Sequence, residues 1–163
     1  MEKAYFAGGC FWCITPIFRS LEGVENVVSG YCGGHEQNPS YEDVKNQRTG
    51  HRETICIHFD PAAVSFEALL QIFLDSVDPF DAGGQFIDRG FSYTLAVYYL
   101  TEAQKITAQA KLQQLENEAG RKPCIALEPF KSFYTAEEYH QNYDLKNPEE
   151  FHRELVESGR IKE

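Results

Sequence analysis

The sequence predicts an α+β fold: a ferredoxin-like two-layer sandwich in which helices cover one face of a sheet. The first observation behind this prediction is the order of elements, a β-α-β unit followed by a second β-α-β unit. The second is size and composition, because 163 residues with 42% hydrophobic and 25% charged side chains fit a folded domain with a real core. We therefore expect one domain spanning residues 1–163.

Six segments make up the predicted βαβ-βαβ core, and an extra helix, an extra strand and an irregular C-terminal tail follow it. In chain order the core segments are a strand at 3–7, a helix at 12–20, a strand at 24–31, a strand at 53–60, a helix at 66–76 and a strand at 93–100. The extra helix is at 102–119, and the extra short strand lies near 124–128.

The helix at 102–119 has the clearest boundaries. Thr101 can cap its first turn, and Gly120 can end it in a left-handed turn. The tail after Pro129 is rich in Tyr, Phe and Glu, and we expect it to wrap the sheet with one or two short helices. The predicted buried stripe along the helix consists of Ile106, Ala110, Leu112, Leu115 and Ala119.

Composition excludes several classes of function. A formal net charge of −10 disfavours nucleic acid as a partner, because phosphate binding needs a basic surface. No apolar run approaches the ~20 residues that cross a bilayer, and the first strand follows Met1 too closely for a signal peptide. Five cysteines is an odd number, which favours reduced thiols and a cytoplasmic location.

Cys10 is the leading candidate for a reactive group. It lies where the first strand turns into the first helix, and free N–H groups and the helix dipole favour a thiolate there. Lone cysteines are usually structural, but the preceding Gly8-Gly9 turn favours a nucleophile. Phe11 and Trp12 can supply an apolar seat beside it. Two long loops, 33–52 and 78–92, are also expected to carry function.

Cys13 forms a Cys-x-x-Cys pair with Cys10. Residues i and i+3 of a helix lie about 5–6 Å apart, a separation that a disulfide tolerates. Such a pair fits a thioredoxin-like redox motif or half of a zinc site. Cys32, Cys56 and Cys124 are too scattered to complete a set of four zinc ligands, so we expect no metal.

Glu53 opens the strand at 53–60 and shares a face with Ile55, Ile57 and Phe59, because side chains alternate along a strand. A carboxyl on an apolar face is costly when ionised, so burial would raise its pKa and make it a general acid. Alternatively, Glu53 lies just outside the core at the mouth of the strand. Cys56 points to the opposite face in either case.

Ordered motifs occur along nearly the whole chain. The most specific are Gly8-Gly9-Cys10-Phe11-Trp12 and Gly50-His51-Arg52-Glu53, and others are Gly30-Tyr31-Cys32-Gly33-Gly34, Asn38-Pro39-Ser40-Tyr41, Asp78-Pro79, Gly84-Gln85, the segment 88–93 and the segment 133–141. With them the chain resembles the peptide methionine sulfoxide reductase A family. The resemblance implies reduction of the S epimer of methionine sulfoxide, free or within proteins.

The same resemblance implies roles for individual residues. Cys10 would attack the sulfoxide sulfur, Glu53 would protonate the departing oxygen, and the product would be a Cys10 sulfenic acid. The residues implied to bind the substrate are Tyr41 and Tyr93, as donors to the oxygen, Asp88, through water, and Phe11 and Trp12, around the methyl group. No bound cofactor is implied, but an external thiol is: thioredoxin, glutaredoxin or glutathione.

The chain departs from the family pattern where the sulfenic acid is regenerated. Cys13 stands where many members have Gly, Lys45 stands where many have a cysteine, and no cysteine follows Cys124. The resolving thiol is therefore Cys13, Cys32 or Cys124, or else an external thiol acts directly. Two other classes remain open: a general thiol-disulfide oxidoreductase using Cys10 and Cys13, and a non-enzymatic zinc-binding module.

Overall fold

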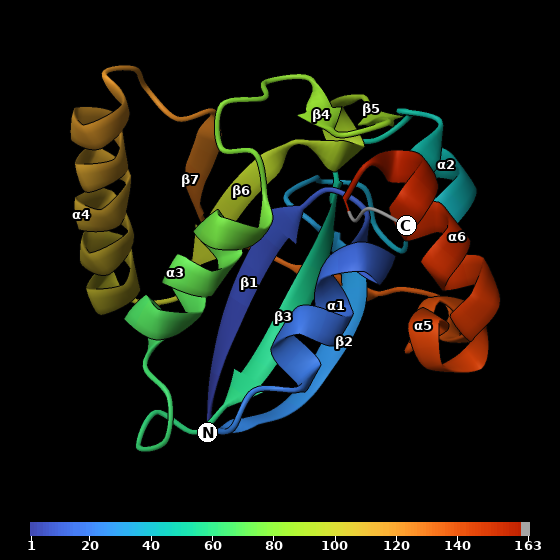
Figure 1. Ribbon diagram of the computed structural model, residues 1–163, viewed down its shortest axis with the longest axis horizontal. Helices are drawn as coiled ribbons and strands as arrows, with labels where there is room; N and C mark the ends of the chain where they lie inside the picture. The colour runs from blue at the N-terminus through green and yellow to red at the C-terminus, as the bar shows by residue number, and fades with distance from the viewer. Residues whose placement is uncertain (161–163) are drawn as a thin grey trace.

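Six strands form one mixed sheet in the computed structural model, which describes residues 1–160 (Figure 1). Residues 161–163, the end of the predicted domain, lie outside the described residues. The sheet has the order β7-β6-β1-β3-β2-β8. Its strands are β1 (Glu2–Gly8), β2 (Val24–Cys32), β3 (Arg52–Phe59), β6 (Leu95–Tyr99), β7 (Ile125–Pro129) and β8 (Phe133–Thr135).

The four central strands confirm the predicted ferredoxin-like sandwich. They run in the order β6-β1-β3-β2, and each neighbouring pair is antiparallel. The helix α1 (Phe11–Arg19) joins β1 to β2, and α3 (Phe66–Ser76) joins β3 to β6. Figure 1 shows both helices on the same face of the sheet. The strand β7 adds to β6 in parallel, and β8 pairs with β2 in antiparallel.

Each face of the sheet has its own buried cluster. Ile55, Ile57 and Phe59 of β3 lie in the larger cluster with residues of α1 and α3, such as Phe18 and Phe73. The smaller cluster, on the opposite face, includes Cys32, Cys56, Tyr98 and Tyr5. Alternation along β3 therefore separates the two sets of side chains as predicted. The connection between β7 and β8 crosses the smaller cluster and packs Phe130 on Tyr5 with ring centroids 4.3 Å apart.

The helix α4 (Glu102–Ala119) has the predicted boundaries but not the predicted buried stripe. Thr101 Oγ1 accepts a hydrogen bond from the Gln104 N–H, and Gly120 ends the helix with φ +72°. Ile106, Ala110 and Ala119 are exposed, whereas Gln104 and Ala108 are buried and Leu112 and Leu115 are half-buried. The prediction was wrong because the buried face of α4 begins with a polar residue, Gln104, which an apolar pattern cannot reveal. The side-chain amide of Gln104 donates to Lys3 O and accepts from the Leu100 N–H.

The two long loops contain short elements that the sequence analysis did not predict. They are α2 (Tyr41–Lys45), the hairpin of β4 (Gly84–Gln85) and β5 (Asp88–Arg89), and the 3₁₀ turn η1 (Phe91–Tyr93). Because η1 precedes it, β6 starts two residues later than the predicted strand at 93–100. Tertiary contacts hold these elements: the Gln47 amide, for example, bonds Ser92 through both its oxygen and its nitrogen.

The tail adopts the short helices that were predicted and adds one strand, β8, to the edge of the sheet. Its other elements are the 3₁₀ turn η2 (Glu138–His140), α5 (Tyr143–Lys146) and α6 (Pro148–Ser158). In Figure 1, α2, the β4–β5 hairpin and the end of α6 gather around the end of the sheet where α1 begins. Within residues 1–160, no helix combines the length and apolarity that a bilayer span requires.

Candidate active site

Cys10 lies between the end of β1 and the first residue of α1, as the sequence predicts. It is the N-cap residue of α1 and is half-buried. The turn depends on Gly9, whose φ of +87° disfavours side chains and whose added Cβ would lie 2.8 Å from Gln85 Cβ. The sharp turn therefore places the Cys10 thiol at the positive end of a nine-residue helix.

Glu53 is buried beneath this turn, with a residue exposure of 1%. The Phe11 N–H, the first free amide of α1, donates to Glu53 Oε1 over 3.2 Å. Among residues 1–160, Oε2 has no hydrogen-bond partner. Burial raises the pKa of the carboxyl to about 8, against the lowering effects of the Phe11 N–H and the Tyr93 hydroxyl. At neutral pH Glu53 is therefore mostly a protonated acid in the core, and not a carboxylate at the mouth of the strand.

The Cys10 and Cys13 thiols lie close enough to affect each other's titration. The interaction with Cys13, burial and the nearby carboxyls raise the pKa of Cys10, whereas the interaction with Cys10 lowers the pKa of Cys13. The expected lowering of the Cys10 pKa at the helix terminus is thus absent in the resting pair. The physical reason is that the interaction with Cys13 and burial favour the protonated form of Cys10, while Glu53 accepts the first helical amide.

A cavity of about 380 Å³ opens beside Cys10. Cys13, Trp12, Tyr41, Asp88 and Tyr93 line it, so the structure brings most of the predicted substrate-binding residues together. Burial raises the pKa of both tyrosines, which keeps their hydroxyls as hydrogen-bond donors. Burial also raises the pKa of Asp88. Two larger hollows, of about 590 and 560 Å³, border α4 and contain none of these residues.

Phe11 differs from the other predicted substrate-binding residues, because its side chain does not reach the cavity surface. It is fully buried and packs on Tyr31 with ring centroids 5.9 Å apart. Trp12 alone supplies a large apolar wall next to Cys10. Phe11 contributes to the site through its backbone N–H, which bonds Glu53.

His140 holds the Trp12 wall in place and was missed by the sequence analysis. The indole N–H of Trp12 donates to His140 Nδ1 over 3.0 Å, so the imidazole proton lies on Nε2. The ring is buried, which lowers its pKa and keeps it neutral, and it packs on Tyr41 with centroids 4.2 Å apart. The signal was present in the motif of residues 133–141, where a histidine follows two glutamates and Tyr139.

The other cysteines do not approach Cys10. Cys32 and Cys56 belong to the cluster on the opposite face of the sheet, and burial raises the pKa of Cys32 to about 12. Cys124 lies just before β7, where its thiol donates to Phe80 O, and it is half-buried. Within residues 1–160, no three His, Cys, Asp or Glu side chains are arranged to hold a metal ion.

A thiol pair, a protonated carboxyl and phenol donors around one cavity are the groups of a thiol-dependent reductase. The model of the family described as "Peptide methionine sulfoxide reductase" matches residues 2–162. The curated protein "Peptide methionine sulfoxide reductase MsrA" of Bacillus velezensis is 48% identical over 161 residues, which cover 98% of this chain and 91% of that protein. The chain belongs to the peptide methionine sulfoxide reductase family.

Solved structures have the same fold. Reduced Mxr1 from Saccharomyces cerevisiae matches with a TM-score of 0.84 and 29% identity, over 91% of this chain and 86% of that one. The structure of Mxr1 in complex with Trx2 matches with a TM-score of 0.58 and 21% identity, over 87% of this chain and 84% of that one. The second match supports the fold alone.

Proposed function

We propose that this chain reduces methionine-S-sulfoxide, free or within proteins, to methionine. The observation that carries the proposal is the placement of the protonated Glu53 carboxyl on the N–H of Phe11, the residue after Cys10, which itself lines a cavity. Sulfoxide reduction needs a thiolate to attack sulfur and an acid to protonate a poor leaving group, the oxygen. Membership of the family supports the substrate class.

In the first step, the Cys10 sulfur forms a bond to the sulfoxide sulfur while Glu53 protonates the oxygen. The S–O bond then breaks as hydroxyl transfers to Cys10, which leaves a Cys10 sulfenic acid and the thioether of methionine. The methionine sulfur is reduced by two electrons and the Cys10 sulfur is oxidised by two. The oxygen and the proton from Glu53 end together in the sulfenic acid, and the proton of the Cys10 thiol restores the acid form of Glu53, so the step needs no other reactant.

The cavity supports an assignment of substrate-binding roles. Tyr41 and Tyr93 are proposed to donate hydrogen bonds to the sulfoxide oxygen, and the raised pKa of each phenol supports this. Trp12 would pack against the substrate methyl group, with Phe11 as buried support. Asp88 lines the same cavity and would orient water near the oxygen.

Cys13 is proposed to resolve the sulfenic acid by forming a disulfide with Cys10. Its position in the cavity that Cys10 lines and its lowered pKa support this choice. Cys32, by contrast, faces the other side of the sheet. A dithiol protein of the thioredoxin class would then reduce the disulfide, as the complex of Mxr1 with Trx2 suggests for a relative. We place the enzyme in the cytoplasm, where the five free cysteines would stay reduced.

Product analysis tests the proposal. Wild-type protein, incubated with a racemic methionine sulfoxide and dithiothreitol, should consume only the S epimer. Cys10→Ser should give no turnover, and Cys56→Ser, a matched change on the opposite face of the sheet, should retain it. Turnover by Cys10→Ser would contradict the assignment of the nucleophile.

Thiol counting tests the resolving step separately. One equivalent of sulfoxide, added without reductant and followed by denaturation, should remove two of the five thiols in wild-type protein and one in Cys13→Ser. Cys32→Ser should still lose two. Loss of two thiols in Cys13→Ser would assign the resolving role to another cysteine.

A further inference from the structure

The end of α6 returns the chain to the cysteine pair. Gly159 follows α6 with φ +82°, and its N–H donates to Val156 O over 3.1 Å. The Arg160 N–H donates to Leu155 O, also over 3.1 Å. These bonds fix the direction in which the Arg160 side chain leaves the helix. Its Nη2 lies 3.1 Å from the position of a Cβ added at Gly9, the residue before Cys10.

The half-buried Arg160 side chain places two of its three guanidinium nitrogens out of contact with solvent. Its Cζ lies 4.5 Å from the centroid of the Phe86 ring, in a cation–π contact. Its Nε and Nη2 are buried and have no hydrogen-bond partner among residues 1–160. A buried cation is costly without a compensating negative charge, so an anion nearby would stabilise this arrangement.

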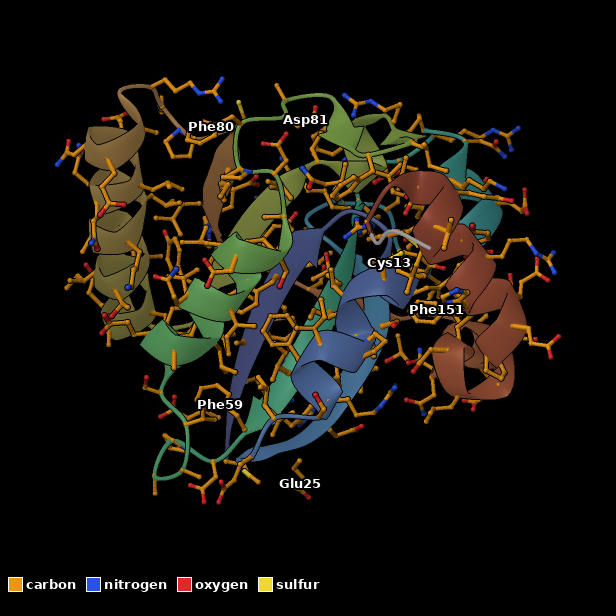
Figure 2. All side chains as sticks on the ribbon, viewed as in Figure 1. Cys13, Glu25, Phe59, Phe80, Asp81 and Phe151 are labelled. Atoms are coloured by element: carbon orange, nitrogen blue, oxygen red, sulfur yellow. The ribbon has the colours of Figure 1, made fainter. Side chains whose placement is uncertain are left out.

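Cys13 is one nearby group that can supply this charge, beside Asp75, which lines the same hollow as Arg160, and Asp88, whose pKa Arg160 also lowers. Cys13 lines two hollows: the 380 Å³ cavity that it shares with Cys10, and a second hollow of about 360 Å³ that it shares with Arg160 and Phe151. Figure 2 shows Cys13 on α1 beside α6, which carries Phe151. Cys13 therefore borders both the cavity that holds Cys10 and the hollow that holds the guanidinium.

The other charged groups around Cys13 are mostly acidic. The interaction with Cys10 and the charge of Arg160 lower the pKa of Cys13, whereas burial, Asp88 and Glu154 raise it. The remaining charged side chains that line the two hollows are Lys45, Asp75 and Glu157. Arg160 is the cation that opposes the carboxylates on the α6 side.

We propose that Arg160 is the positioning residue for resolution: it stabilises the Cys13 thiolate that attacks the Cys10 sulfenic acid, an inference that rests on the proposed role of Cys13. In this step the Cys13 sulfur forms a bond to the Cys10 sulfur and the Cys10 S–O bond breaks. Hydroxide leaves and takes up a proton to become water. The Cys10 sulfur is reduced and the Cys13 sulfur is oxidised, so electrons balance within the pair.

Three variants test this role: Arg160→Gln removes the charge, Arg160→Lys keeps it, and Arg153→Gln removes an exposed arginine from the same helix as a control. In each, one equivalent of sulfoxide should still yield one equivalent of thioether, which shows that the site is folded. The rate at which the second thiol disappears at pH 7 should fall about tenfold in Arg160→Gln, because loss of the cation raises the pKa of Cys13 and leaves less thiolate to attack. Arg160→Lys should recover most of that rate.

The pH profile separates an electrostatic role from a structural one. In a Cys10→Ser background, alkylation of Cys13 by iodoacetamide is followed by peptide mass analysis. The pH at which the alkylation rate of Cys13 reaches half its maximum should rise when Arg160→Gln is added. It should not change when Arg153→Gln is added. An unchanged midpoint would overturn the inference. Because this readout needs no sulfoxide, it stays informative even if thiol counting shows that Cys13 does not resolve, an outcome that would refute the role of Cys13 itself.

Discussion

Glu53 shows how one residue obtains its chemistry from its surroundings. On the exposed end of a strand the same carboxyl would be ionised at neutral pH and could donate no proton. Here the aromatic and aliphatic side chains of the larger cluster exclude water, and the pKa rises to about 8. The single amide that bonds Oε1 lowers the pKa too little to reverse this effect.

The first residue-scale prediction concerns removal of the acid. Glu53→Gln should lower the rate of the first turnover by on the order of 10²–10⁴, because the amide keeps the shape and a hydrogen bond but cannot protonate the oxygen. Stopped-flow measurement of thioether formation gives this rate. Glu25→Gln is the matched control, since Glu25 is exposed on β2 at the opposite end of the sheet (Figure 2). A wild-type rate in Glu53→Gln would remove Glu53 from the mechanism.

The second residue-scale prediction concerns pH. The acid form of Glu53 is present below its pKa of about 8 and is lost above it. The first-turnover rate per Cys10 thiolate, with the thiolate fraction measured by alkylation at each pH, should therefore fall as pH rises through about 8, by tenfold per unit well above it. The descending limb should be absent from the residual rate of Glu53→Gln. If the rate of Glu53→Gln still falls above about pH 8, the fall is caused by titration of a group other than Glu53.

At the scale of elements, the turn between β1 and α1 depends on Gly9. Two glycines with positive φ provide a matched comparison: Gly120, at the end of α4, has nothing within 4 Å of an added Cβ, whereas Gly9 meets Gln85 at 2.8 Å. Gly120→Ala should cost about 1 kcal/mol of unfolding free energy through backbone strain alone. Gly9→Ala should cost more, because the β4–β5 hairpin must also shift.

Urea denaturation and turnover measure the two glycine variants. We expect Gly120→Ala to retain full activity per folded molecule and Gly9→Ala to lose most of it, since the displaced hairpin carries Asp88. Equal losses of stability in the two variants would show that Gln85 moves away from the added methyl group of Gly9→Ala without a cost in unfolding free energy.

Elements with strong local signals were predictable from sequence. Thr101 and Gly120 fix the ends of α4, and alternation along β3 places Glu53 on the core face. The short α2, the β4–β5 hairpin and β8 were not predictable, because contacts between distant residues hold them. The Gln47–Ser92 bonds and the pairing of Gly30 with Thr135 are examples. The prediction of which α4 residues are buried was wrong for the same reason, because Gln104 is buried by partners outside its helix.

The candidate site follows the same division. Cys10 and Glu53 could be placed from a turn and an alternation, which are local features. His140 and Arg160 reach the site only because the tail folds back onto it. His140 bonds Trp12, 128 residues earlier in the chain. Arg160 approaches the turn at Gly9. No periodicity in a tail of short helices reports such a contact.

For the whole molecule, the protonation of Glu53 links activity to stability. Its pKa is raised from 4.5 to about 8 by folding, so the native state binds an additional proton between these values. The stability that this proton contributes is complete below about pH 4.5 and is lost as pH rises through about 8. At pH 7 the loss is on the order of 3 kcal/mol relative to acid conditions.

Glu53→Gln should remove this pH dependence, because the amide does not titrate. The difference in unfolding free energy between the variant and wild type should therefore change by about 2–3 kcal/mol in favour of the variant between pH 5 and pH 7. Urea denaturation at both pH values measures it, and comparison within each pH cancels the other titrating groups. Glu25→Gln should show no such change. Parallel stability curves for Glu53→Gln and wild type would mean that the buried carboxyl is already ionised at pH 7, which would also remove it as the acid.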